Sequence, residues 1–126
     1  MRIPEPAAVM RHRVPALLLD AIDTFTGDHL TCRSRDVGRW SWPLVLEGAA
    51  QTAGLLAGLQ TDGPGDAAVI AEYRNVVVHV PVASGTLRFT ALLERRLLDF
   101  WRCRVEARSG EGVLLLDGLV TVTAGA

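Results

Sequence analysis

The stretch LVLEGAAQTAGLLAGLQ, residues Leu44–Gln60, decides the fold. It carries a single charge, at Glu47, and otherwise consists largely of Ala, Gly and Leu. Pro43 stands directly before it and suits the first position of a helix. As a helix these seventeen residues would extend about 25 Å, and they would be apolar on nearly every side, which is typical of a helix in a core. Small residues recur at i, i+4 spacing in two series, Ala49-Ala53-Ala57 and Ala50-Gly54-Gly58.

The segments around this helix have the two-residue alternation of strands. The clearest is Phe100–Arg108, in which Trp101, Cys103, Val105 and Ala107 face one way and charged residues face the other. The order of strand, strand, buried helix and about four further antiparallel strands predicts one α+β domain over residues 1–126, with a sheet wrapped around a central helix. The other predicted strands are Ala16–Phe25, His29–Asp36, Val69–Val80, Thr86–Leu93 and Val113–Val122, and residues 1–16 are expected to be irregular, with a short helical turn around 6–12.

Composition excludes several classes of function. The chain has 126 residues, 49% of them apolar, yet no apolar run reaches the length of a membrane span. The net charge is −1, without long charged runs, so nucleic acid is not an expected partner. The first residues, MRIPEPAAVM, lack the pattern of a signal peptide, so a cytoplasmic protein is expected. All thirteen basic residues are Arg, and most are expected on solvated faces.

The cysteines and histidines do not form a metal-binding pattern. Cys32 and Cys103 alternate with polar neighbours and are expected as reduced, inward-facing residues of strands. The three histidines, His12, His29 and His79, show no spacing typical of metal ligands. No metal and no cofactor are therefore expected.

Short motifs in the expected order carry a resemblance to a known family. His12-Arg13 followed by Leu18-Leu19-Asp20 resembles a Pro-His-Arg…Leu-Leu-Asp opening. The helix LVLEGAAQTAGLLA resembles a Val-Leu-x-x-Glu-Ala-Met-Ala-Gln-Ala-Ala-Gly motif, matching it at Glu47, Ala50, Gln51 and Gly54. Pro81, Val82, Gly85 and Leu87 match a later Pro-Val-x-Pro-Gly-Asp-x-Leu motif. Over nearly its whole length the chain resembles the hotdog-fold 3-hydroxyacyl-ACP dehydratases, in their FabZ/ApeP-like branch.

One departure from that family concerns catalysis. The dehydratases carry Gly-His-Phe-Pro in a loop before the helix acid, whereas the residues between Asp36 and Glu47 are VGRWSWPLVL and include no histidine. The loop also looks about eight residues shorter than the family's. An ungapped count places Arg33 at the histidine position, on the wet face of a strand. His12 corresponds to a structural position of the family, and His79 is expected to point away from its flanking valines.

The resemblance implies a composite catalytic site. In the family a histidine of one subunit removes the C2 proton, and the helix acid of the other subunit assists the departing hydroxyl. It implies a 3-hydroxyacyl substrate on the phosphopantetheine of an acyl carrier protein, in fatty-acid or polyketide (type II or polyene-like) biosynthesis. Glu47 and Gln51 are the candidate catalytic residues, Gln51 by orienting the acid. The candidate substrate-binding residues are Trp40, Trp42, Ala50, Gly54 and Phe89.

Alternatives remain open at several points. Glu47 could simply compensate the helix dipole, although a lone carboxylate on a helix buried all round would be costly. Trp40 and Trp42 could fill the core or an interface instead of lining an acyl channel. Three functions follow: half of a dehydratase heterodimer whose second hotdog subunit supplies the histidine, which is favoured; a homodimeric hotdog thioesterase that uses Glu47 alone; or a non-catalytic acyl-chain binder.

Overall fold

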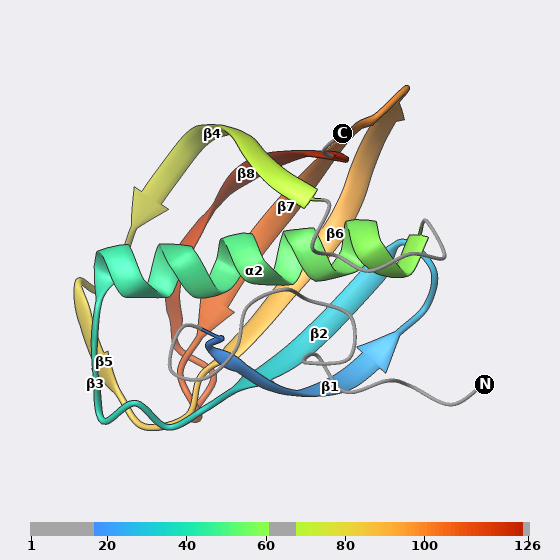
Figure 1. Cartoon of the computed structure of the whole chain (residues 1–126). Helices are drawn as coiled ribbons and strands as arrows, with labels where there is room; N and C mark the ends of the chain where they lie inside the picture. Colours follow the sequence, from blue (N-terminus) through green and yellow to red (C-terminus); the bar gives the residue numbers. More distant parts are fainter. Residues whose placement is uncertain (1–16, 61–67, 125–126) are drawn as a thin grey trace.

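The structure is a computed structural model that describes residues 17–60 and 68–124. One long helix, α2, lies across a curved antiparallel sheet (Figure 1). The predicted turn at 6–12 lies outside the described residues, as does His12. In chain order the elements are β1 Leu19–Phe25, β2 His29–Ser34, β3 Arg39–Ser41, α2 Trp42–Gln60, β4 Ala68–Val78, β5 Val82–Ser84, β6 Arg88–Leu97, β7 Phe100–Arg108 and β8 Leu114–Ala124.

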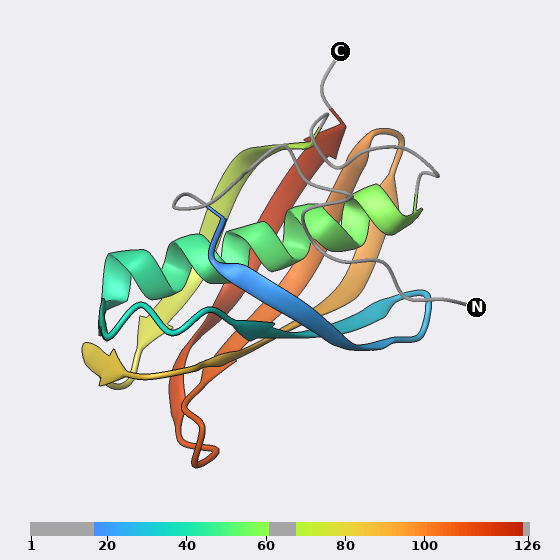
Figure 2. The same ribbon diagram turned by 60° about the horizontal axis from the view of Figure 1, so that its bottom comes forward.

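Six strands form the main sheet, in the order β1-β2-β6-β7-β8-β4. All their pairings are antiparallel, and β4 and β1 are the two edges. The short strands β3 and β5 pair with each other near the start of α2 (Figures 1 and 2). This arrangement confirms the predicted α+β fold with a sheet wrapped around one central helix. Within residues 17–60 and 68–124 no helix is both long and apolar enough to span a bilayer.

Predicted and observed boundaries differ mainly where local chemistry was ambiguous. The helix begins at Trp42, two residues before the predicted start, so Pro43 lies in its first turn, where a missing N–H is harmless. The strand β6 continues to Leu97, four residues past its predicted end. A bulge between Leu93 and Arg95 shifts the two-residue alternation on which that prediction depended. The strand β7 has the predicted bounds, and its four predicted inward residues are buried.

Small residues let α2 approach the sheet closely. A Cβ added to Gly48 would lie 2.3 Å from Cζ of Phe89, which is fully buried on β6. The Phe89 ring also meets Trp40 edge-on, with ring centroids 5.9 Å apart. The Trp40 indole N–H in turn donates to the carbonyl of Gly85 at 2.8 Å. Gly48, Phe89 and Trp40 therefore lock the start of the helix against β6 and the β3–β5 pair.

We expect Gly48→Ala to destabilise the protein. Alanine favours a helix by about 1 kcal/mol over glycine, but its methyl group would overlap a ring that has no free space, and overpacking costs about 1–3 kcal/mol. Urea unfolding should show a net loss of stability. In a Phe89→Leu background, where the ring is gone, the same substitution should lose most of its cost. An equal cost in both backgrounds would contradict the contact.

Burial also determines the acidity of the two cysteine thiols. Both cysteines are buried on the inner face of the sheet, as predicted. Burial raises the pKa of the Cys32 thiol to about 12, with a smaller contribution from the charge of Asp23. It raises the pKa of Cys103 to about 12 as well, with Glu94 contributing less.

Both thiols should therefore resist a disulfide reagent at about pH 8 in the folded protein and react rapidly in urea, because the thiolate is the reactive form. The folded chain holds these protons above the ordinary pKa of 9.0. The thiols' contribution to stability should thus be complete below pH 9 and fall as the pH rises towards 12. Cys32→Ser and Cys103→Ser would assign any residual reactivity.

Candidate functional site

Glu47 lies on α2, but its setting differs from the expected one. Compensation of the helix dipole would place it in the first turn, whereas that turn contains no acidic residue and Glu47 follows it. Because interaction with the helix dipole falls off within one turn, dipole compensation explains Glu47 poorly. Its side chain is also exposed, so the expected cost of a buried carboxylate does not apply to the single chain. The helix is buried on every side only from Gly48 to Gly58.

Gln51 connects Glu47 to the backbone of Leu18, which directly precedes β1. Its side chain is 3% exposed. Its Oε1 accepts a hydrogen bond from the Leu18 backbone N–H at 2.8 Å, and its Nε2 donates to Glu47 Oε1 at 3.3 Å. The bond from Leu18 decides which end of the amide faces Glu47. Gln51 thus hydrogen-bonds the acid that it is predicted to orient, and a buried amide contacts an exposed carboxylate.

Tyr73 is a neighbour of Glu47 that the sequence reasoning missed. It lies on β4 opposite Val120, a buried residue of the inner face, so its side chain is directed to the side of the sheet that carries α2. Partial burial raises the pKa of the Tyr73 hydroxyl, and the negative charge of Glu47 raises it further. The polar step Glu72–Asn75 obscured this position, although Tyr73 is the single tyrosine of the chain.

Exposed apolar side chains surround the start of α2. Trp42 is 43% exposed, and Ser41 before it pairs with Val82, which is also exposed. The end of β4 adds Val78, which pairs with the inner-face residue Leu116. Grouped exposed apolar side chains are typical of a binding or association surface. We call Trp42, Tyr73, Val78 and Val82 the apolar rim.

The remaining candidate substrate-binding residues are covered in the single chain. Trp40 and Phe89 have no exposed surface, and Ala50 is 2% exposed. Gly54 is buried in the helix as well. Trp40 therefore takes the core position that was left open as its alternative, while Trp42 is accessible to a ligand. A role for Ala50, Gly54 and Phe89 beside an acyl chain stays a prediction.

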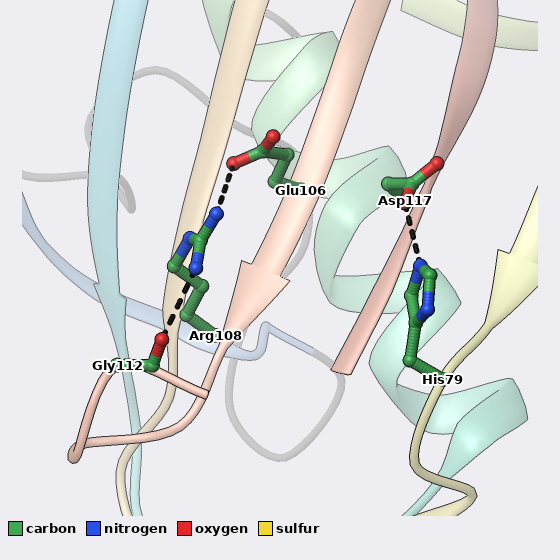
Figure 3. Close-up of polar contacts among 5 residues, drawn as sticks. All are labelled: His79, Glu106, Arg108, Gly112 and Asp117. Atoms are coloured by element: carbon green, nitrogen blue, oxygen red, sulfur yellow. Dashed lines mark hydrogen bonds and ion pairs between the residues drawn. The ribbon is translucent and has the colours of Figure 1, made fainter. Parts of the chain in front are cut away.

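The described histidines have partners or positions away from Glu47. His79 follows β4, and its Nε2 lies 2.7 Å from Oδ2 of Asp117 on β8 (Figure 3). Asp117 belongs to the outer face of the sheet, opposite Glu106, which interacts with Arg108 (Figure 3). His29 is the first residue of β2, which pairs with the edge strand β1. Among the residues that the structure describes, no three His, Cys, Asp or Glu side chains are grouped as metal ligands would be.

Replacing Glu47 should change the titration of Tyr73. We expect Glu47→Gln to lower the pKa of Tyr73, because the neighbouring negative charge is removed, yet to leave it above 10.0, because burial is the larger cause. Ultraviolet titration of the phenolate measures this directly in a chain with one tyrosine. Glu72→Gln is the matched control, since Glu72 precedes Tyr73 but lies on the opposite sheet face. Equal shifts in both variants would argue against a shared Glu47–Tyr73 site.

Comparison with known proteins supports the fold and not a particular activity. No family model matches the sequence, and no curated protein matches it. Solved structures do match. The dehydratase heterocomplex ApeI:P from Xenorhabdus doucetiae contains a chain that is similar with a TM-score of 0.84 at 19% identity, over 99% of this chain and 93% of that one.

Other similar structures are more distant. The uncharacterised protein PH1136 from Pyrococcus horikoshii matches over 98% of this chain and 94% of its own, with a TM-score of 0.73 and 13% identity. A hypothetical thioesterase with coenzyme A from Streptococcus pneumoniae matches over 84% and 85%, with a TM-score of 0.68 and 11% identity. Together with the strand order and the central helix, these likenesses identify the fold of the chain as a hotdog fold.

Proposed function

We propose that the chain is one subunit of a 3-hydroxyacyl-ACP dehydratase, acting in fatty-acid or polyketide biosynthesis in the cytoplasm. It supplies Glu47 to a composite site, and a second hotdog subunit supplies the histidine. The observation that carries this proposal is the orientation of Glu47: a buried glutamine, itself held by the Leu18 backbone, hydrogen-bonds an exposed carboxylate whose charge acts on Tyr73. A carboxylate on the surface for solvation alone would have no need of a buried amide.

The chemistry divides between the two subunits. Dehydration breaks the C2–H bond and the C3–O bond, forms the C2=C3 double bond and releases water. The partner's histidine accepts the C2 proton, and Glu47, in its carboxylic acid form, donates a proton to the hydroxyl that leaves as water. Transfer of the proton from the histidine back to Glu47 restores both groups. Gln51 restricts the rotation of Glu47 and so reduces the entropic cost of reaching that geometry. Tyr73 offers a hydroxyl on the same side of the sheet.

The β4 strand is the surface that we assign to the second subunit. It is a sheet edge in the described chain and lies beside the apolar rim. An edge strand of this length has unpaired backbone groups that another strand can satisfy. The similar structure from Xenorhabdus doucetiae is a dehydratase heterocomplex, which supports a heterodimer over a homodimer. The acyl carrier protein is the expected donor of the substrate.

The test combines the chain with a hotdog protein that has Gly-His-Phe-Pro. We expect the pair, and neither protein alone, to dehydrate a 3-hydroxyacyl-ACP, with the product followed by mass spectrometry. Glu47→Gln should lower the rate of the pair about 10²- to 10⁴-fold. Glu94→Gln, which removes a carboxylate that pairs with Arg104, is the matched control and should keep the rate. Dehydration by the chain alone would refute the need for a partner's histidine.

A thioesterase is the second candidate function, because thioesterases are among the similar structures. In that reaction Glu47 would act without a histidine, as base or nucleophile towards the thioester carbonyl. The same preparations decide between the two functions. Release of free acid from an acyl thioester by the chain alone, abolished by Glu47→Ala, would establish the thioesterase and exclude the heterodimeric dehydratase.

A further inference from the structure

A groove of about 480 Å³ lies on the outer face of the sheet, away from the site around Glu47. The strand β7 shows which face this is. Trp101 and Cys103 are buried towards α2, so Arg102 between them is directed to the opposite side, where it lines the groove. On β4 the same alternation separates Tyr73 on the inner face from the groove residues before and after it.

One row of side chains crosses four strands along this groove. Arg95 on β6 pairs in register with Arg102 on β7, Arg102 with Thr121 on β8, and Thr121 with Glu72 on β4. All four residues line the groove. Two arginines thus stand directly opposite each other on adjacent strands, an arrangement that destabilises a sheet when no anion lies between the charges.

Within residues 17–60 and 68–124, neither Arg95 nor Arg102 forms an ion pair with a carboxylate. Other outer-face arginines do: Arg104 contacts Glu94 at 3.0 Å. At the β4 end of the groove Arg74 contacts Glu72 at 3.5 Å. The Arg95–Arg102 pair therefore combines a like-charge contact with open donors.

Apolar side chains occupy the next position along the groove. Leu97 pairs in register with Phe100, and both line the groove while remaining 57% and 48% exposed. The turn between them includes Leu98 at φ 53°, a left-handed conformation that costs a leucine more than a glycine or asparagine. Guanidinium groups and an exposed aromatic ring thus lie in the same groove.

We propose that this groove is a binding site for a small organic anion with an apolar body. A phosphate or carboxylate group lies between Arg95 and Arg102, whose planar guanidinium groups suit bidentate contacts with either anion. The apolar body packs on Phe100 and Leu97, and the Thr121 hydroxyl is available for a further hydrogen bond. The Glu72–Arg74 ion pair closes the far end and disfavours a second negative charge there. The site is independent of the proposed dehydratase activity.

The test uses the full-length chain and four probes: naphthyl phosphate, naphthoate, uncharged naphthol and inorganic phosphate. Nitrogen-15 NMR of the arginine Nε–H groups reports where each probe binds. We expect naphthyl phosphate or naphthoate, or both, to bind saturably and shift the Arg95 and Arg102 signals. Naphthol and inorganic phosphate should bind at least about tenfold more weakly than the better naphthyl anion, since each lacks one of the two contacts. The stronger of the two naphthyl anions identifies the head group.

Matched variants complete the test. Arg95→Gln and Arg102→Gln should each weaken binding about tenfold, because a charge-assisted contact is lost. Neither should lower the urea midpoint, because each removes a like-charge contact. Arg104→Gln, on the same strand and face but paired with Glu94, should bind normally. The proposal is overturned if no anion binds, if naphthol binds as well as the anions, or if Arg104→Gln weakens binding as much as the groove variants.

Discussion

The contact between Gly48 and Phe89 is the constraint on which the other features depend. It lets α2 lie directly on the sheet, with no space for even one methyl group at that point. Because Phe89 also meets Trp40, the same contact places the β3–β5 pair and the start of the helix together. The position of Glu47, one residue before Gly48, follows from it. A bulkier residue at position 48 would move the acid as well as the helix.

Much of this architecture could be predicted from the sequence, because its causes are local. The apolar, small-residue composition of Leu44–Gln60 indicated a buried helix, and the alternation in Phe100–Arg108 indicated an inner and an outer strand face. The Gln51–Glu47 hydrogen bond followed from their spacing of one helical turn. These inferences needed only the periods of the helix and the strand.

The parts that could not be predicted depend on pairings between distant residues. Nothing near Leu18 indicates that its N–H reaches Gln51, and it is this bond that orients the amide. Tyr73 and the Arg95–Arg102 pair each lie beside a bulge, where one extra residue changes which face the following side chains occupy. A strict two-residue alternation misplaces residues after such a point.

In the described chain β4 is an edge of the sheet, and this affects how the protein behaves when it is synthesised in a cell. Val77 and Val78 are exposed at this edge, beside backbone groups that can accept any compatible strand. In the proposed heterodimer, a molecule made without the second subunit would have the same surface available for copies of itself. Synthesis of the two proposed subunits in matched amounts would limit this self-association, so the proposal implies balanced production for the sake of folding as well as of catalysis.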